Sequence, residues 1–315
     1  MCSKKGTKMS LAISSVQNRN VEPQTPSFKT RLASVKSSKD FNISYNTAMA
    51  QKAAVMPAIY FGNGKEIILA RKFDAIFAKY SKENNPLILK VKDGFSRQIA
   101  QRILTYPEKP IIIGIAGQSG SGKTTFLRQM KEIIPENHCR IILGDNYYKD
   151  TAQKRITEGG LLNMFKKGFS FDVPEAVELD LLSSDLEKLS KGESIPKLQY
   201  DFETGGRMLL PEKINPAKLI VVDSIFGLNE KLKDRLDIGV FVESKPETIE
   251  KRFFLRATTE RGKTLDEAKV QYVDVTQKAQ EHIIPTAQNA NIIINGELPL
   301  VHSQQFFNEI HKVFK

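Results

Sequence analysis

The sequence predicts an α/β fold: a parallel sheet of about five strands flanked by helices, preceded by a small α+β region. Two observations lead to this prediction. After residue 108, short and continuously apolar segments alternate with amphipathic ones, as strands covered on both faces alternate with helices. The first apolar segment also runs directly into a glycine-rich loop, and a helical pattern follows that loop.

Three regions differ in composition. Residues 1–56 are rich in Ser, Lys, Asn and Gln without a sustained period, which predicts a disordered basic arm. Residues 57–107 show mixed strand and helix patterns, and we expect a small α+β cap or adaptor domain there. Residues 108–315 carry the alternating pattern and are expected to form the main domain.

Within 57–107, segments 58–62 and 87–91 resemble strands. Between them, the chain from Glu66 begins in a strand-like way and then shows helical spacing of its apolar residues. A second helix is predicted to begin near Ser96, whose hydroxyl is a candidate N-cap, and to end at Tyr106 before a proline.

Five strands are predicted in the main domain, with helices between them. A helix from Thr124 is expected to stop at Pro135, which removes a backbone donor. The predicted strands are Ile111–Ile115, Arg140–Leu143, Leu219–Val222, Ile238–Val242 and Ile292–Ile294.

The excess positive charge gathers near the N-terminus. The 315 residues carry a formal net charge of +11, and residues 1–60 hold nine basic and two acidic side chains, which is seven of those charges. Nucleic-acid-binding proteins usually carry a basic face on their folded part, so this distribution argues against nucleic acid as the main partner. A nucleic-acid or targeting role of the arm stays open, although targeting peptides favour Arg and this arm has mostly Lys.

Composition excludes other classes. A hydrophobic content of 40% with 26% charged residues is that of a globular chain, and no apolar segment approaches the ~20 residues of a membrane helix. Two cysteines, Cys2 and Cys139, do not make a disulfide framework, so we expect a reducing, cytoplasmic location.

The most specific pattern is GQSGSGKT at residues 117–124, which matches G-x-x-x-x-G-K-[ST] in full. Its glycines let successive N–H groups point into one cavity, and the next helix adds its positive end. Lys123 would then meet the β- and γ-phosphates, and the Thr124 hydroxyl would bind Mg²⁺. The residues expected to hold ATP (or GTP) are Gly117, Gln118, Ser119, Gly120, Ser121, Gly122, Lys123, Thr124 and Thr125.

Acidic residues follow two predicted strands. Asp145 comes just after the second strand, where a carboxylate can accept a proton from a hydroxyl or bind Mg²⁺ through water. Asp223 follows four apolar residues, which is the Walker-B pattern that positions Mg²⁺. A polar turn and a helix cap are the alternative explanations of the two acids.

Further motifs occur in a fixed order after the phosphate loop. They are GIAGQSGSGKTT (114–125), GDNYYKD (144–150), FSFDVPEAVELDLL (169–182), GESIPKLQYDFETGGR (192–207), FFLRATTERGKT (253–264) and HIIPTAQNANIIING (282–296). Together they resemble the uridine/cytidine kinase branch of the uridine kinase–phosphoribulokinase family over about residues 109–297. The resemblance implies that residues 108–315 form a P-loop, nucleoside-kinase-like domain.

The resemblance implies roles for individual residues. It makes Asp145 the general base on a nucleoside 5′-hydroxyl, and it puts Asp223 where the family has a metal-holding Glu. The implied catalytic residues are Asp145, Lys123, Arg256 and Arg261. The implied pocket residues are Tyr148, Phe171, Asp172, Tyr200, Phe202 and Gln271, and the implied metal ligands are Thr124, Asp145 and Asp223.

The resemblance also implies a basic lid. Arg252 and Arg256 are four residues apart and share one helical face, and Arg261 and Lys263 follow in the next loop. Such a helix would close over the triphosphate and neutralise developing charge. A solvated basic helix is the alternative.

Three positions depart from the family pattern. Gly205 stands where the family has a base-contacting His, Phe253 where it has a lid Arg, and Lys263 where it has another Arg. Because a lost hydrogen bond to a base costs about 1–3 kcal/mol, the acceptor need not be uridine.

The sequence therefore predicts an ATP- and Mg²⁺-dependent kinase for a small-molecule hydroxyl, with a nucleoside as the first choice. The alternatives are a kinase of the same fold acting on a sugar phosphate or pantothenate, and a regulator that binds ATP without transfer. Neither a membrane nor a nucleic-acid partner is expected, and an assembly of identical chains stays open.

Overall fold

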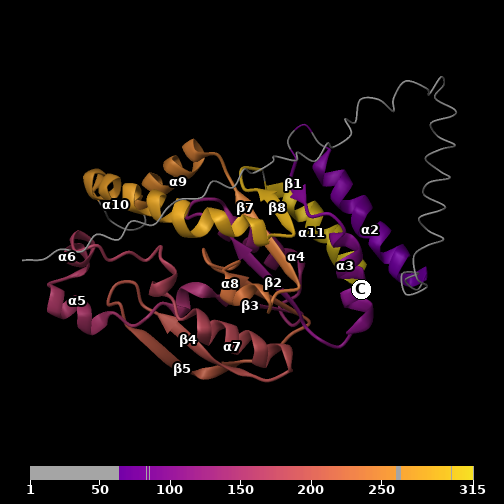
Figure 1. Cartoon of the computed structure of the whole chain (residues 1–315), viewed down its shortest axis with the longest axis horizontal. Coiled ribbons are helices and arrows are strands. Elements are labelled where there is room, and N and C mark those ends of the chain that lie inside the picture. The colour runs from indigo at the N-terminus through magenta and orange to yellow at the C-terminus, as the bar shows by residue number, and fades with distance from the viewer. Residues whose placement is uncertain (1–63, 83, 85, 260–263, 299, 315) are drawn as a thin grey trace, which may run out of the picture. The chain divides into compact units, whose positions relative to one another are not determined.

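A six-stranded sheet in the order β1-β8-β7-β2-β6-β3 forms the centre of the protein (Figure 1). The structure is a computed structural model that describes residues 64–82, 84, 86–259, 264–298 and 300–314. The predicted arm and the predicted strand at 58–62 lie outside these residues. Five strands run parallel, which confirms the predicted sheet: β2 (Ile111–Ala116), β3 (Cys139–Leu143), β6 (Leu219–Asp223), β7 (Ile238–Glu243) and β8 (Ile292–Asn295).

The segment before the phosphate loop is part of this sheet and its core. β1 (Ile88–Val91) pairs antiparallel with β8, and α2 (Gly64–Ser81) and α3 (Phe95–Thr105) share a buried cluster with β2. The described part of the predicted 57–107 domain thus shares a sheet and a hydrophobic core with the strands that follow it.

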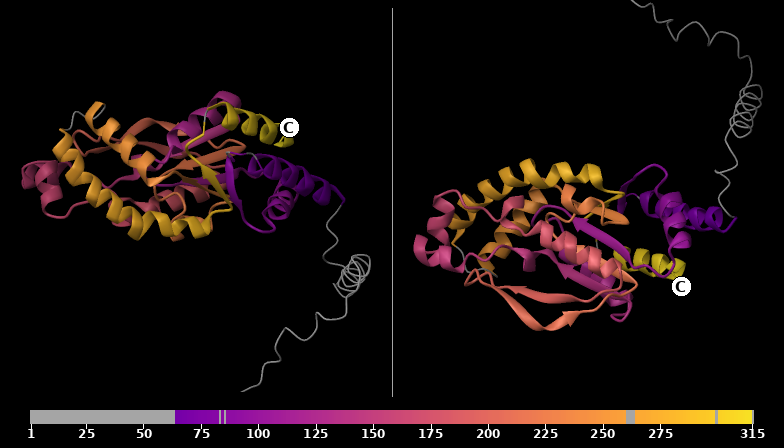
Figure 2. Two further views of the ribbon diagram at one scale, coloured as in Figure 1. Left: turned by 90° about the horizontal axis from the view of Figure 1, so that it is seen from above. Right: turned by 60° about the horizontal axis from the view of Figure 1, so that its bottom comes forward.

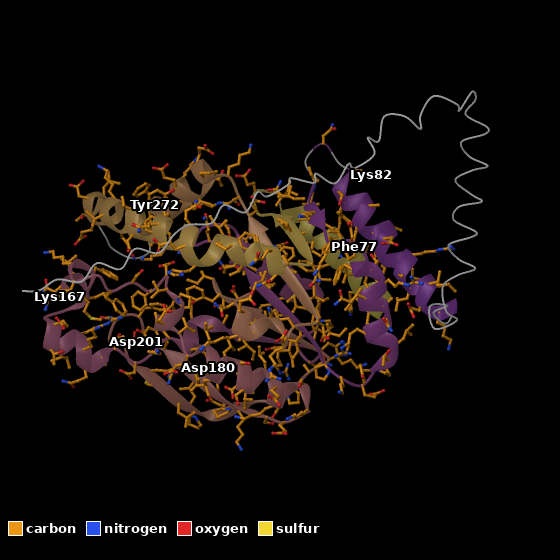
Figure 3. All side chains as sticks on the ribbon, viewed as in Figure 1. Phe77, Lys82, Lys167, Asp180, Asp201 and Tyr272 are labelled. Atoms are coloured by element: carbon orange, nitrogen blue, oxygen red, sulfur yellow. The ribbon has the colours of Figure 1, made fainter. Side chains whose placement is uncertain are left out.

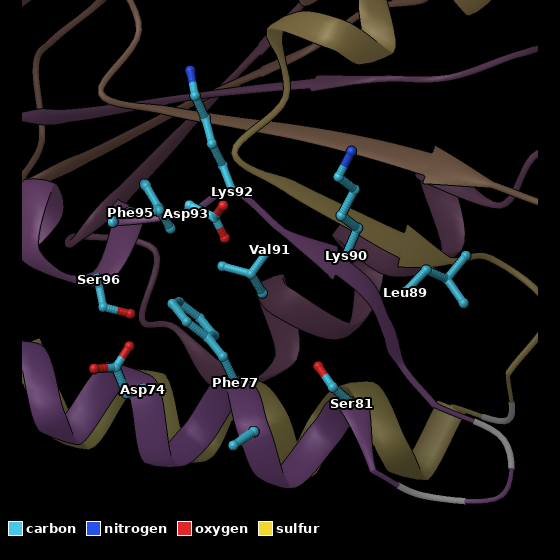
Figure 4. A pocket seen from close by; sticks show the side chains of 12 residues that line it. Asp74, Phe77, Ser81, Leu89, Lys90, Val91, Lys92, Asp93, Phe95 and Ser96 are labelled. Atoms are coloured by element: carbon cyan, nitrogen blue, oxygen red, sulfur yellow. The ribbon is translucent and has the colours of Figure 1, made fainter. Parts of the chain in front are cut away.

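Two local predictions in this segment are wrong. The chain around Glu66 is helical from Gly64 onward, because the buried residues of α2 recur at helical spacing. Ser96 does not cap α3; it is buried inside the first turn, and the N-cap is Gly94 in a left-handed conformation. A hollow of about 360 Å³ lies between α2, β1 and α3 (Figure 4). It lies at the edge strand, three strands away from β2 and the phosphate loop.

Helices cover both faces of the sheet. α4 (Lys123–Ile133), α11 (Leu300–Phe314), α2 and α3 bury one face, and α7 (Leu179–Ser190) and α8 (Glu230–Lys233) bury the other. Residues of β2 alternate between the two cores: Ile111 and Ile115 join the first, and Ile112 and Ala116 join the second. The strand is continuously apolar because both of its faces are covered.

The remaining elements surround the carboxyl end of the parallel strands. They are a hairpin of β4 (Ile195–Tyr200) and β5 (Arg207–Ile214), the short helices α5 (Ala152–Glu158) and α6 (Leu161–Lys166), and the pair α9 (Pro246–Thr259) and α10 (Leu265–Lys278). Figures 1 and 2 show α5 and α6 at the same end of the sheet as α9 and α10. In Figure 3, Lys167, Asp201 and Tyr272 mark the segments that meet there.

Short turns complete the described chain: 3-10 turns at Gly144–Tyr147, Pro174–Ala176 and Ile284–Asn289, and a π-helical turn at Ala279–Ile283. None of the helices in the described ranges combines the length and the hydropathy needed to cross a bilayer.

Candidate active site

The phosphate loop connects β2 to α4 through a backbone that only glycine can adopt. Gly117, Gly120 and Gly122 have φ angles of 146°, 88° and 103°. A Cβ on Gly117 would lie 2.4 Å from the carbonyl oxygen of Val242, and one on Gly122 would lie 2.7 Å from that of Gly296. The loop is thus pressed against two neighbouring segments, and its glycines are required by space as well as by conformation.

Lys123, the first residue of α4, is buried inside this loop. Its Nζ donates hydrogen bonds to the carbonyl oxygens of Gly117 at 2.6 Å and Gln118 at 3.0 Å. Burial lowers the pKa of Lys123, and the carboxylates of Asp223 and Asp145 raise it in opposition. The ammonium group therefore lies in the field of two nearby acids.

The loop fits a polyphosphate. The Oγ of Ser121 is buried without a hydrogen-bond partner, and the helix N-terminus and the lysine contribute positive charge at the same place. Gly117, Gln118 and Ser121 form the frame of the loop and do not line the cleft above it. The loop residues that line the cleft are Ser119, Gly120, Gly122, Lys123, Thr124 and Thr125.

Asp145 and Asp223 lie beside the loop, at the carboxyl ends of two paired strands. Leu143, the last residue of β3, is in register with Asp223 of β6, and Asp145 follows in the 3-10 turn. Both acids line the cleft. Burial raises the pKa of Asp223, the Lys123 ammonium lowers it, and the Asp145 carboxylate raises it again. Two carboxylates and one ammonium are therefore electrostatically coupled.

These acids and Thr124 also bear on metal binding. Within the described ranges, no group of three or more His, Cys, Asp or Glu side chains is arranged to hold a metal ion. The Thr124 hydroxyl and the carboxylates of Asp145 and Asp223 are oxygen donors, which is the type that Mg²⁺ prefers. This donor set fits a Mg²⁺ ion that completes its shell with phosphate oxygens and water.

The cleft has a volume of about 960 Å³ and two chemically different halves. We call one the loop half: it consists of the cleft-lining loop residues with Arg252 and Arg256. We call the other the aromatic half, which consists of Tyr148, Phe165, Phe171, Asp172, Phe202, Glu203, Gln271 and Asp274. Asp145 and Asp223 lie in the same cleft.

Three rings form the wall of the aromatic half. The ring centroids of Tyr148 and Phe171 are 5.1 Å apart, those of Tyr148 and Phe202 are 5.7 Å apart, and those of Phe171 and Phe202 are 5.8 Å apart. Tyr200 was expected beside them but lies behind: it is 6% exposed and does not line the cleft. Its hydroxyl lies 3.1 Å from Thr151 Oγ1, and its ring supports Phe202 at 5.0 Å.

Polar residues link this wall to α10. Asp172 and Gln271 line the cleft as expected. Ser170 Oγ donates to Asp274 Oδ2 at 2.8 Å and accepts from the Asp172 backbone N–H at 3.2 Å. Asp274 was missed by the sequence analysis, although it is three residues beyond Gln271 and therefore on the same helical face.

The predicted lid helix is α9, and its arginines bind the phosphate loop. Arg252 Nη1 donates to the carbonyl oxygens of Gly120 at 3.2 Å and Gly296 at 3.1 Å, and Arg256 Nη2 donates to Ser119 Oγ at 2.5 Å. Arg252 and Arg256 share one helical face, as their spacing predicted, and both side chains contact the loop. Arg261 and Lys263 lie outside the described residues.

Phe253 has a packing role between α9 and α10. It is 3% exposed and belongs to a small core with Ala257, Ala268 and Val275. Its ring centroid lies 5.2 Å from that of Tyr272. The substitution of a lid arginine by Phe253 is therefore matched by an apolar contact that holds the two helices together.

The space that a side chain at Gly205 would need is occupied by other residues. Its φ is 79°, and a Cβ there would lie 2.3 Å from Arg155 Nε and 2.5 Å from Thr151 Oγ1. Arg155 Nη1 donates to the carbonyl oxygens of Phe202 at 2.8 Å and Glu203 at 2.9 Å. No motif marked Arg155, because the hydrogen-bond partners of its side chain are 45 or more positions away in the sequence.

The chain is similar in sequence to a known family and to individual proteins. The model of the phosphoribulokinase / uridine kinase family matches residues 112–300. A uridine kinase of Leuconostoc citreum is 36% identical over 213 residues, which cover 66% of this chain and 98% of that protein. A uridine kinase of Bacillus pumilus is also 36% identical, over 59% of this chain and 86% of that protein.

Among solved structures, the phosphoribulokinase from Rhodobacter spheroides matches with a TM-score of 0.43 at 15% identity, covering 61% of this chain and 74% of that one.

Proposed function

Because the chain belongs to the phosphoribulokinase / uridine kinase family, we propose that it is an ATP-dependent kinase that phosphorylates a hydroxyl of a nucleoside. The loop half of the cleft binds the triphosphate of ATP, and the aromatic half binds the acceptor. Asp145 lies in the cleft that both halves share.

One observation carries the proposal. Asp145, Asp223 and Lys123 line one cleft at the carboxyl ends of neighbouring parallel strands, where the phosphate loop begins. A phosphate-binding lysine and an acid suited to accept a proton are thus within reach of one bound substrate pair. Phosphoryl transfer needs this arrangement, because catalysis rests on positioning and on charge stabilisation.

Each residue has a part in the proposed reaction. Asp145 accepts the proton of the attacking hydroxyl at its carboxylate. Lys123 binds the β- and γ-phosphate oxygens, and Arg256 of α9 stabilises the charge that develops on the transferred group. When bound, Mg²⁺ would neutralise phosphate charge, and Thr124 and Asp223 would hold it. The hydrogen bonds of Arg252 and Arg256 to the loop hold α9 beside the site of the transferred group.

The charge of the aromatic half favours an uncharged acceptor. Asp172, Glu203 and Asp274 line it, and among its described lining residues there is no Lys or Arg. A sugar phosphate or pantothenate would bring a negative charge against these acids, which is unfavourable. A nucleoside is uncharged, its flat base suits the three rings, and its ribose hydroxyls can donate to carboxylates.

A panel of acceptors tests the proposal. ADP release is measured with uridine, cytidine, adenosine, ribulose 5-phosphate and pantothenate, and the phosphorylated product is identified by mass. We expect turnover with at least one nucleoside and none with the two anionic acceptors. ATP hydrolysis without any phosphorylated acceptor would favour a regulatory ATP-binding protein, and turnover of an anionic acceptor would refute the charge argument.

A further inference from the structure

Arg155 is a buried cation held by backbone carbonyls. It is 7% exposed on α5. The Asp201 carboxylate interacts with it electrostatically, but its oxygens accept hydrogen bonds from the Glu203 backbone N–H and the Thr204 hydroxyl. Its Nη1 donates to the carbonyl oxygens of Phe202 and Glu203, and its Nη2 lies 3.5 Å from the Tyr200 hydroxyl. The Nε of Arg155 is buried without a hydrogen-bond partner, which is costly, so the position of this side chain needs a reason.

The guanidinium group occupies the place of a side chain at position 205. A Cβ on Gly205 would lie 2.3 Å from Nε and 2.7 Å from Cζ of Arg155, both far inside van der Waals contact. The Thr151 backbone N–H also donates to the Gly205 carbonyl oxygen at 2.8 Å, which closes the loop onto α5. Arg155 in this position and a side chain at 205 therefore exclude one another.

Arg155 also touches both sides of the aromatic wall. Its Cζ lies 5.9 Å from the ring centroid of Phe171, which is a cation–π distance. Its Nη1 donates a hydrogen bond to the backbone carbonyl oxygen of Phe202. These two rings come from segments far apart in the sequence, and their centroids are 5.8 Å apart. Arg155 therefore links α5 to the ring of Phe171 and to the backbone that carries Phe202.

We propose that Arg155, lodged in the space left by Gly205, is a positioning residue that sets the gap between Phe171 and Phe202 and thereby selects the acceptor. The proposal rests on the kinase function above and concerns binding in the aromatic half only. Arg155 lies outside the loop half and does not line the cleft, so ATP binding and the transfer step do not depend on it.

The first test is the variant Arg155→Met, which keeps length and removes the charge and the hydrogen bonds. We expect the KM for the preferred nucleoside to rise about tenfold while kcat and the KM for ATP stay within about twofold, because only acceptor binding is lost. Arg155→Lys should recover part of this loss, since an ammonium reaches one carbonyl but lacks the guanidinium fork.

The second test inserts a methyl group at position 205. Gly205→Ala is expected to displace Arg155 and to raise the acceptor KM by a similar factor. Gly192→Ala is its matched control, because Gly192 has a φ of 82° and nothing within 4 Å of the new Cβ. The control carries the same backbone strain without the clash, so its acceptor KM should equal that of the parent protein.

The double variant Arg155→Met/Gly205→Ala decides whether the two positions act as one unit. We expect an acceptor KM about tenfold above the parent value, as in either single variant, because the second change removes an interaction already lost. Effects that multiply to about a hundredfold, or single variants with an unchanged acceptor KM, overturn the proposal.

Folding is followed by the melting temperature of each variant. If Arg155→Met does not fold, Arg155→Lys and Gly205→Ala carry the test. A Gly205→Ala variant that fails to fold while Gly192→Ala folds would assign the pair to stability and also overturn the proposal. An inactive parent protein would instead refute the kinase function, so the two failures are distinguishable.

Discussion

The two halves of the cleft are built in different ways. Most of the loop half comes from one continuous segment, residues 119–125, with Arg252 and Arg256 added from α9; the shape of the segment is fixed by left-handed glycines and by the backbone atoms packed against them. The aromatic half is assembled from the side chains of Tyr148 and of segments 165–172, 202–203 and 271–274. The first depends on backbone geometry and tolerates little change. The second can change its preference by exchanging side chains while the fold is kept.

The largest expected effect separates chemistry from binding. Asp145→Asn removes the proton acceptor but keeps the size of the side chain, so we expect kcat to fall about 10³-fold while the Kd for ATP changes less than about threefold. Single-turnover kinetics and ATP titration measure the two quantities. Asp180→Asn on α7, labelled in Figure 3 and highly exposed, is the control and should behave as the parent protein. A parental kcat in Asp145→Asn would remove this residue from the base role.

The loop half should respond in the opposite way. Lys123→Met removes the charge buried against Asp223 and Asp145, and we expect the Kd for ATP to rise roughly a hundredfold. Acceptor binding should change little. Isothermal titration with ATP and with the nucleoside checks this, with Lys231→Met at the exposed ion pair with Asp180 as control. Equal weakening of both ligands would mean that the two halves are not independent.

This contrast explains what the sequence could predict. The loop, the five parallel strands and the positions of Asp145 and Asp223 at or just after strand ends follow from local patterns, because strand–loop–helix order and strand ends determine them. The place of Tyr200 behind Phe202, and the role of Arg155, depend on contacts between distant segments, so no spacing reveals them. Likewise β1 looked like part of a separate domain because its pairing with β8 spans about two hundred residues.

A third prediction concerns Phe253, which packs between α9 and α10 beside the cleft. Phe253→Arg restores the residue type expected from the family pattern but buries a charge in the small core of α9 and α10. We expect a loss of roughly 3 kcal/mol in the stability of this helix pair, measured by hydrogen exchange of α9 and α10. Val270→Arg, at a position 77% exposed on α10, should change exchange little. Unchanged protection in Phe253→Arg would show that the ring is not a packing residue.

The smallest effect tests the turn that carries Asp145 between the two halves. The Tyr147 hydroxyl donates to Asp185 Oδ2 of α7 at 3.0 Å, in a site where Asp185 is 2% exposed. Tyr147→Phe should therefore lower the free energy of unfolding by about 1–2 kcal/mol at pH 8, because Asp185 loses a buried donor. Urea unfolding measures it, and Tyr106→Phe at an exposed ring is the control.

The same pair predicts a pH dependence with a definite sign. Burial, and then the charge of Asp185, raise the pKa of Tyr147 above its ordinary value of 10.0. The folded protein therefore keeps this phenol protonated where the unfolded chain releases the proton, and the resulting stability is complete below pH 10.0 and declines above it. Tyr80 and Tyr272 also have raised pKa values, through burial, and contribute equally to parent and variant. The difference in unfolding free energy between the parent protein and Tyr147→Phe should accordingly shrink from pH 8 to pH 11. A difference that stays constant over this range would mean that Tyr147 ionises freely and that the Asp145 turn is anchored by other contacts.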